Sequence, residues 1–376
     1  MKKIAVVNRT NLINYGSVLQ CYALCEAIKN LGYESEIIWE QGNLSKNFDF
    51  RPIKIFKTML KLIMHPSLLK STLKNIKEVR EKEINPETVK LFSEFVENNI
   101  HQKKFSHKEM LAVAHGDEYY KLICGSDQVW CSTTTYVDPL MYLRFAPKEK
   151  RIAYAPSIGR DYIPKYNRRQ MRKYIKDIPY VSIREDDGKR LIKELTGREV
   201  PVVLDPTLLL ARETWESLKN KNIYTKRPYL LCYFLDTPCE KTQKSICSIA
   251  ADNNLKIISI GRKLDIDGID NPICGPSEFL SYASDAELVV TDSYHGMLFS
   301  MIFERQFWSI KRDYQQFDQS SRQLTILNRL NLKERYLEDA SNLSLDTINY
   351  NVVNSTLRTL RKDSLNYLLM AIENQI

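Results

Sequence analysis

Apolar runs rich in β-branched residues recur along this chain, and stretches patterned as helices separate them. This alternation limits the possible folds more than any other feature of the sequence. The runs predict a first set of strands at 3–7, 35–39, 122–125, 152–155, 181–184 and 202–204, and a second set at 229–235, 256–260, 288–291 and 307–310. Because strands that alternate with helices pair in parallel and are covered on both faces, we expect an α/β protein.

The two sets of strands predict two domains. A polar segment rich in lysine and asparagine, residues 211–228, separates the sets, and 376 residues are about twice the length of a typical domain. We predict two Rossmann-like domains that face a cleft. The first covers 1–215, with a helical insertion at about 45–110, and the second covers 225–376. The terminal stretch 357–376 is patterned as a helix that can pack back on the first domain.

Composition excludes several classes of protein. A hydrophobic fraction of 43% with 27% charged residues is typical of a soluble globular protein. The net charge of +9 suits anionic substrates or an anionic membrane surface, and no nucleic-acid-binding module is recognisable, so we expect no nucleic acid as a partner. No segment approaches the roughly 18 apolar residues of a membrane span, and the first apolar run is too short for a signal peptide. We expect a cytoplasmic protein.

Motifs for common cofactors and metals are missing. The eight cysteines form no CxxC pair and match no zinc-binding spacing, so we expect reduced thiols and no metal. GxGxxG, P-loop, GxSxG and HExxH motifs are also absent, which leaves dinucleotide, P-loop, esterase and zinc-protease chemistry without support.

One histidine follows a predicted strand at a position where α/β proteins bind ligands. Small polar residues after the strand 288–291, including Asp292 and Ser293, lead to His295 at the start of a predicted helix. In an open α/β sheet, ligands bind beyond the carboxyl ends of the strands. Histidine transfers protons near neutral pH. We interpret His295 as a candidate acid–base group; the alternative is a helix-terminal histidine satisfied by backbone carbonyls.

The first strand leads into a turn that suits an anion or a hydroxyl. Asn14, Gly16 and Ser17 precede a helix-patterned stretch. Glycine permits close backbone approach, and serine caps a helix while N–H groups face outward. Many α/β proteins begin in this way without binding a ligand there.

Polar residues also follow the strand 122–125. Asp127 and Gln128 can hold sugar hydroxyls, and Trp130 can offer a face for stacking. The alternative is a capped turn with a core tryptophan.

Arginines follow other strands. Arg184 ends a strand, and Arg312 and Arg322 follow the last one. Arginine binds carboxylates and phosphates in a bidentate manner. The alternatives are an ion pair of Arg184 with the acidic residues directly after it, and a solvated surface for the other two. Asp205 is interpreted as structural, in a turn that closes the first domain.

Residues 51–77 form a basic, amphipathic segment. It holds seven lysines and arginines and no acidic residue, and Pro66 is expected to divide it into two short helices. Basic amphipathic stretches can rest on anionic lipid. Peripheral contact with the inner face of the membrane is therefore one hypothesis. The alternative is a surface helical hairpin that packs one face on its domain.

Six short motifs, taken together, resemble the polysaccharide pyruvyltransferase family. They occur in the family's order and span roughly residues 3 to 335. The motifs are Asn14–Gln20, Gly125–Trp130, Ala153–Gly159, Ser182–Glu185, Val203–Leu209 and Thr291–Gly296.

The resemblance implies a fold and an activity. Members of this family are similar in architecture to two-domain glycosyltransferases of the GT-B type, so the first domain is expected to take the acceptor and the second the donor. They transfer pyruvate from phosphoenolpyruvate to two hydroxyls of a sugar, forming a cyclic ketal and releasing phosphate. The implied partners are phosphoenolpyruvate and a glycan or lipid-linked saccharide of a capsule or exopolysaccharide. No cofactor is implied besides this donor substrate.

The resemblance also implies roles for the candidate residues. His295 resembles the acid that protonates the donor or the base for the acceptor hydroxyl, with Asp292 orienting it, and Arg184 resembles the clamp for the anionic donor. Family members often carry an arginine two positions before this histidine, where this chain has Ser293. Arg322 or Arg312 is expected to supply the missing charge. The implied acceptor-binding residues are Asn14, Gly16, Ser17, Asp127, Gln128 and Trp130.

Two alternatives to pyruvyl transfer remain open at the level of sequence. The first is a GT-B-type glycosyltransferase that uses a nucleotide sugar. The second is a non-catalytic carbohydrate-binding relative, to which the serine at position 293 gives weight.

Overall fold

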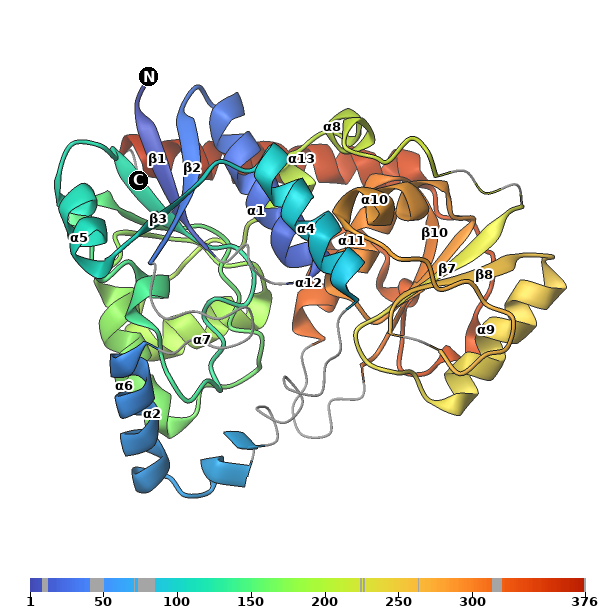
Figure 1. Cartoon of the computed structure of the whole chain (residues 1–376), viewed down its shortest axis with the longest axis horizontal. Coiled ribbons are helices and arrows are strands. Elements are labelled where there is room, and N and C mark those ends of the chain that lie inside the picture. The colour runs from blue at the N-terminus through green and yellow to red at the C-terminus, as the bar shows by residue number, and fades with distance from the viewer. Residues whose placement is uncertain are drawn as a thin grey trace.

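The chain folds around two parallel sheets (Figure 1). The computed structural model describes residues 1–8, 13–40, 51–70, 72–73, 85–223, 225, 227–262, 264–312 and 320–374. In spatial order, the first sheet consists of β3 (Gln102–Phe105), β2 (Glu34–Glu40), β1 (Lys3–Val7), β4 (Lys121–Cys124), β5 (Arg151–Ala153) and β6 (Tyr180–Val181). The second consists of β11 (Tyr336–Leu337), β10 (Gln306–Ile310), β9 (Leu288–Thr291), β7 (Tyr229–Phe234) and β8 (Lys256–Gly261).

Helices alternate with the strands of both sheets. Those of the first half are α1 (Tyr15–Asn30), α2 (Pro52–Met64), α4 (Pro86–Asn99), α5 (His107–His115), α6 (Lys165–Lys176) and α7 (Asp186–Thr196). Those of the second half are α8 (Arg212–Ser217), α9 (Glu240–Asp252), α10 (Pro276–Asp285), α11 (Tyr294–Ile302), α12 (Ser321–Arg329) and α13 (Tyr350–Glu373).

Three hydrophobic cores hold the layers together, and one of them is shared by the two halves. Alternate residues of a strand point to opposite faces of its sheet. In β1, Ile4 and Val6 therefore face the shared core, while Ala5 and Val7 face a core on the outer side of the first sheet. The shared core holds side chains of α1 from the first half and of α10 and α11 from the second. The ring of Tyr15 on α1 stacks on the ring of Phe279 on α10, with 4.8 Å between the ring centroids.

The predicted α/β fold with two parallel sheets is confirmed. Two short strands were not predicted, β3 and β11, and both lie at the edge of a sheet. The predicted strand 202–204 is reduced to one bridge between Val202 and Ile183. Within the described residues, no helix combines the length and the apolar character needed to cross a membrane.

The C-terminal helix packs back on the first half, as the sequence predicts. Helix α13 begins at Tyr350, before the predicted start, and Figure 1 shows it running along both halves. The Leu204 N–H donates to the Ser364 hydroxyl at 3.0 Å, and Arg361 Nε donates to the Leu208 carbonyl at 2.7 Å. These bonds tie the helix to the segment that follows the first sheet.

Candidate active site

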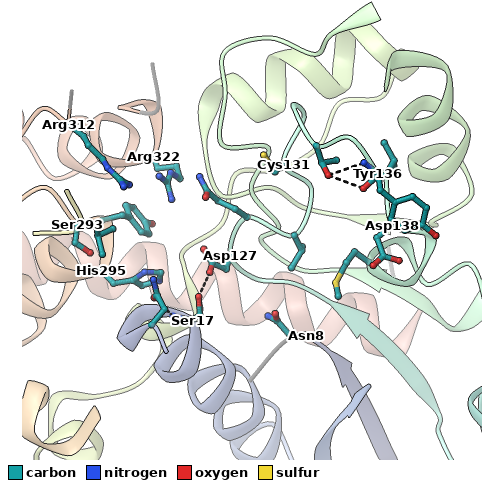
Figure 2. Close-up of a pocket in the computed structure, with 18 of the residues that line it drawn as sticks. Asn8, Ser17, Asp127, Cys131, Tyr136, Asp138, Ser293, His295, Arg312 and Arg322 are labelled. Carbon is teal, nitrogen blue, oxygen red and sulfur yellow. Dashed lines mark hydrogen bonds between the residues drawn. The ribbon is translucent and has the colours of Figure 1, made fainter. Parts of the chain in front are cut away.

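A cavity of about 450 Å³ lies where the carboxyl ends of strands from both sheets meet (Figure 2). All the strand pairings are parallel, so the segments that leave the carboxyl ends lie at one edge of each sheet, the position at which α/β proteins bind ligands. The first half contributes residues that follow β1 and β4, and the second half contributes residues that follow β7, β9 and β10.

The wall from the second half carries two arginines, of which Arg312 forms an ion pair with Asp236. Figure 2 shows Arg312, Arg322, Ser293 and His295 gathered on one side of the cavity. The Arg322 guanidinium lies 5.7 Å from the centroid of the Tyr294 ring. Ser293 caps α11, and its hydroxyl accepts from the Gly296 N–H at 3.3 Å. Arginines beside a helix N-terminus form a favourable site for an anion.

The wall from the first half carries carboxylates, amides and hydroxyls. It consists of Asn8, Asn14, Ser17, Asp127, Gln128, Cys131, Thr134, Tyr136 and Asp138, together with the apolar side chains of Val129, Val137, Met141 and Tyr142. Asp138 forms an ion pair with the buried guanidinium of Arg51. These groups can donate to and accept from neutral hydroxyls, so this wall suits a sugar better than an anion.

The imidazole of His295 lies between α1 and the turn after the first sheet. A Cβ atom at Gly16 would come within 2.0 Å of His295 Nδ1, so only glycine lets α1 approach the ring this closely. On the other side, His295 Nε2 lies 3.5 Å from Asp205 Oδ2. Gly16 therefore stands behind the histidine and does not line the cavity.

Asp205 is a fully buried carboxylate with two contacts of different kinds. One oxygen caps the turn, as expected from the sequence, and accepts from the Thr207 N–H at 3.0 Å. The other faces His295 and also forms an ion pair with Arg184. Burial alone would raise the pKa of Asp205, but the charges of His295 and Arg184 hold it well below its usual range. The interpretation of Asp205 as only a structural turn is thereby corrected.

Arg184 lies behind the cavity. Its side chain is fully buried, and its guanidinium contacts Asp205, reaches Asp127 Oδ1 at 3.4 Å and stacks on Tyr294 at 4.5 Å. These groups raise the pKa of Arg184 although burial opposes its charge. The geometry does not favour a direct clamp on the donor, because Arg184 does not line the cavity. The ion-pair partners of Arg184 are Asp127 and Asp205, and not the acidic residues that directly follow it in the sequence.

Asp127 presents an ionised carboxylate to the cavity. Its backbone adopts a left-handed conformation with φ of 62°, which aspartate tolerates better than most residues. Ser17 Oγ donates to Asp127 Oδ2 at 2.6 Å. Burial opposes ionisation, but the charges of Arg184 and His295 and the bond from Ser17 keep the pKa of Asp127 below its usual range.

Asp292 holds a loop of the second half. Its carboxylate accepts from the N–H groups of Leu235 at 2.7 Å and Asp236 at 3.1 Å, and Arg312 Nε lies 3.8 Å away. Burial raises the pKa of Asp292 to about 6. Among the contacts of the described residues, none joins Asp292 to His295. The expectation that Asp292 orients the histidine is therefore corrected, since Asp205 occupies that position.

The structure brings together most of the predicted site residues. Those that line the cavity are Asn14, Ser17, Asp127, Gln128, Asp292, Ser293, His295, Arg312 and Arg322. Trp130 belongs to the core instead: it stacks on Tyr142 at 5.0 Å and donates from Nε1 to the Met141 carbonyl at 2.8 Å. Its expected role as a stacking face for the acceptor is corrected.

Sequence reasoning missed part of the wall from the first half. Thr134, Tyr136 and Asp138 lie in the irregular segment between β4 and β5, where no periodic pattern marks them. In the described part of the chain, no cluster of histidine, cysteine and carboxylate side chains is arranged to hold a metal ion.

Comparisons with solved structures give matches at low identity. A UDP-GlcNAc 2-epimerase from Neisseria meningitidis is 10% identical, with 99% of this chain and 94% of that chain covered and a TM-score of 0.47. The Methanocaldococcus jannaschii UDP-GlcNAc 2-epimerase is 12% identical, with 95% and 92% covered and a TM-score of 0.48. The E. coli ADP-heptose LPS heptosyltransferase II is 10% identical, with 96% and 99% covered and a TM-score of 0.38. Scores below 0.5 carry no information on what this chain binds.

Sequence comparison identifies the family. No curated protein sequence matches the chain. The family described as "Polysaccharide pyruvyl transferase" matches residues 14–314, a range that includes most of both sheets and nearly all of the cavity lining. The match covers well over half of the chain. This protein therefore belongs to the polysaccharide pyruvyl transferase family.

Proposed function

We propose that this protein transfers pyruvate from phosphoenolpyruvate to two hydroxyls of a sugar, in a bacterial surface polysaccharide or its lipid-linked precursor. The products are a cyclic ketal and inorganic phosphate. Membership of the family supports a transferase of polysaccharide biosynthesis. The observation that carries the proposal is the division of the cavity into a cationic wall and a wall of hydroxyl-binding groups.

The cationic wall suits the donor. Phosphoenolpyruvate carries a phosphate and a carboxylate, and both anions bind well to guanidinium groups and to helix N-termini. Arg312 and Arg322 offer two guanidinium groups at the N-terminal end of α11. They supply the positive charge that an arginine at position 293 often supplies in other members of the family.

The opposite wall suits the acceptor. Asp127 is ionised and accepts from a hydroxyl, while Gln128 and Tyr136 can both donate and accept. A sugar bound there would place its hydroxyls between this wall and the donor.

The proposed chemistry requires one acid and one base. A proton added to the methylene carbon of phosphoenolpyruvate leaves a cation-like carbon that bears the phosphate. One sugar hydroxyl adds to this carbon and gives up its proton; a second hydroxyl then adds as phosphate leaves with the second proton. His295 is the proposed acid, with Asp205 Oδ2 lying 3.5 Å from its Nε2, and the neutral imidazole that remains after proton transfer is the proposed base for the acceptor hydroxyl. A positioned acid typically contributes a factor of ~10²–10⁴ to the rate.

The test is turnover with defined donors. The full chain is incubated with phosphoenolpyruvate and saccharide preparations, while phosphate release is measured and products are examined by mass spectrometry. We expect a pyruvylated saccharide with the wild type and with His101→Gln, an exposed control, and its loss with His295→Gln. Consumption of a nucleotide sugar instead, or glycan binding without turnover of either donor, would contradict the proposal.

A further inference from the structure

Helix α2 presents apolar side chains to solvent. Within Pro52–Met64, no side chain is buried. Six large apolar side chains are between 46% and 75% exposed, namely Ile53, Phe56, Met59, Leu60, Ile63 and Met64. A surface helix of a globular protein normally turns its apolar side toward the core, and contiguous exposed apolar surface of this kind marks an interaction site.

The side of α2 that carries Lys61 faces the protein. The Lys61 ammonium donates to Asn167 Oδ1 on α6 and lies 5.1 Å from the centroid of the Tyr166 ring. Burial lowers the pKa of Lys61 to about 8. The ring of His65, directly after the helix, lies 5.4 Å from the same tyrosine. The helix is therefore anchored to α6 by its polar side, and its apolar side is directed away from the domain.

Helix α6 adds positive charge beside the apolar surface, and Figure 1 shows the two helices next to each other. The sequence of α6 contains no acidic residue. Its basic residues are Lys165, Arg168, Arg169, Arg172, Lys173 and Lys176, and all of them except the half-buried Arg168 are exposed.

We infer that α2 and α6 form a docking surface for an anionic lipid bilayer. The apolar side of α2 enters the boundary between head groups and acyl chains, and the cations of α6 meet the anionic head groups. A second copy of the chain would also cover the apolar side of α2. A symmetric contact of that kind would bring the basic α6 helices of both copies together, and their repulsion favours lipid as the occupant.

The docking surface is joined to the acceptor wall of the cavity. Arg51, directly before α2, forms an ion pair with Asp138, which lines that wall. On α6, the Asn167 amide donates to the carbonyls of Ser132 at 2.6 Å and Thr134 at 2.9 Å, and Thr134 also lines the wall. On the proposed function, this placement favours a saccharide acceptor that is anchored in the bilayer.

The test is sedimentation of the full chain with lipid vesicles. Vesicles of phosphatidylglycerol and phosphatidylcholine are compared with vesicles of phosphatidylcholine alone, and we expect binding to the first kind. Phe56→Ser/Ile63→Ser should weaken this binding at least tenfold. Arg169→Glu/Arg172→Glu should weaken it about 30-fold or more, since each cation near an anionic surface contributes about fivefold.

Matched variants on another part of the surface serve as controls. Val352→Ser/Met370→Ser removes exposed apolar side chains from α13. Lys333→Glu/Lys362→Glu reverses two exposed charges elsewhere. Both controls should bind the anionic vesicles as the wild type does. Circular dichroism of each variant in the absence of vesicles shows that it is folded.

Three results would overturn the inference. The first is equal binding of the wild type and the α2 and α6 variants. The second is equal binding to charged and uncharged vesicles. The third is a wild-type dimer, seen by sedimentation velocity without lipid, that Phe56→Ser/Ile63→Ser dissociates, because the surface would then be an interface between copies. The readout is binding and not turnover, so these results are separate from those that test pyruvyl transfer.

Discussion

Replacement of Asp205 by asparagine removes one charge from the buried network behind the cavity and leaves its shape almost unchanged. Asparagine retains an oxygen that can accept from Thr207, so the turn is kept. The buried Arg184 then loses its ion-pair partner and keeps only Asp127, at 3.4 Å. Breaking a buried ion pair by removing one partner costs about 3–5 kcal/mol. We expect the free energy of unfolding to fall by about that amount.

Urea unfolding followed by tryptophan fluorescence measures this change. Trp215 is buried between the halves, against Tyr22 and Phe299, and reports on their separation. The pKa of Asp205 is lowered in the folded state, so its stabilising charge is present above the unfolded pKa of about 3.9. The stabilisation is lost as the pH falls through the folded pKa. The difference between the wild type and Asp205→Asn should therefore narrow below about pH 4.

A double variant provides the control for Asp205→Asn. Arg184→Met/Asp205→Asn removes both charges, and it should be less destabilised than the sum of the single variants by more than ~1 kcal/mol. A loss below about 1 kcal/mol in Asp205→Asn, or additive single variants, would refute the view that the two charges act as a pair.

Three further predictions concern other parts of the site. Gly16→Ala should displace the His295 ring and abolish turnover while the circular dichroism spectrum is kept, whereas Gly116→Ala, whose added carbon would lie 3.3 Å from the nearest atom, should remain active. Because burial raises the pKa of Asp292 to about 6, the wild type should lose up to about 3 kcal/mol of stability relative to Asp292→Asn as the pH rises from 4 to 7; parallel pH profiles in urea unfolding would contradict this. Trp130→Ala should lower the free energy of unfolding by about 3–5 kcal/mol in the same assay, because its ring is buried against Tyr142, and a loss below about 1 kcal/mol would contradict its place in the core.

The sheets were predictable from sequence where strands are buried on both faces. In β1, successive residues enter two different cores, so the strand is apolar throughout and stands out in the sequence. Strand β3 lies at an edge and contains Lys103 and Lys104, both exposed, so it carries no such pattern. Edge strands have one partner and are often charged, which makes them hard to recognise from composition.

The site was predictable where residues follow strand ends. Asp127, Ser293 and His295 were found because parallel topology places such residues at one edge of a sheet. The contact of Asp205 with His295 was not found, because it depends on how α11 packs against a turn from the other half of the molecule. The burial of Arg184 was not predicted for the same reason, because its partners come from three segments that are far apart in the sequence.

Calorimetric titration with phosphoenolpyruvate tests the central claim most directly, with the wild type compared with Arg312→Gln/Arg322→Gln. We expect saturable binding by the wild type, and at least a tenfold loss in the variant because two charge-assisted contacts are removed. Absence of binding by the wild type, or equal binding by the variant, would contradict the assignment of the cationic wall to this donor.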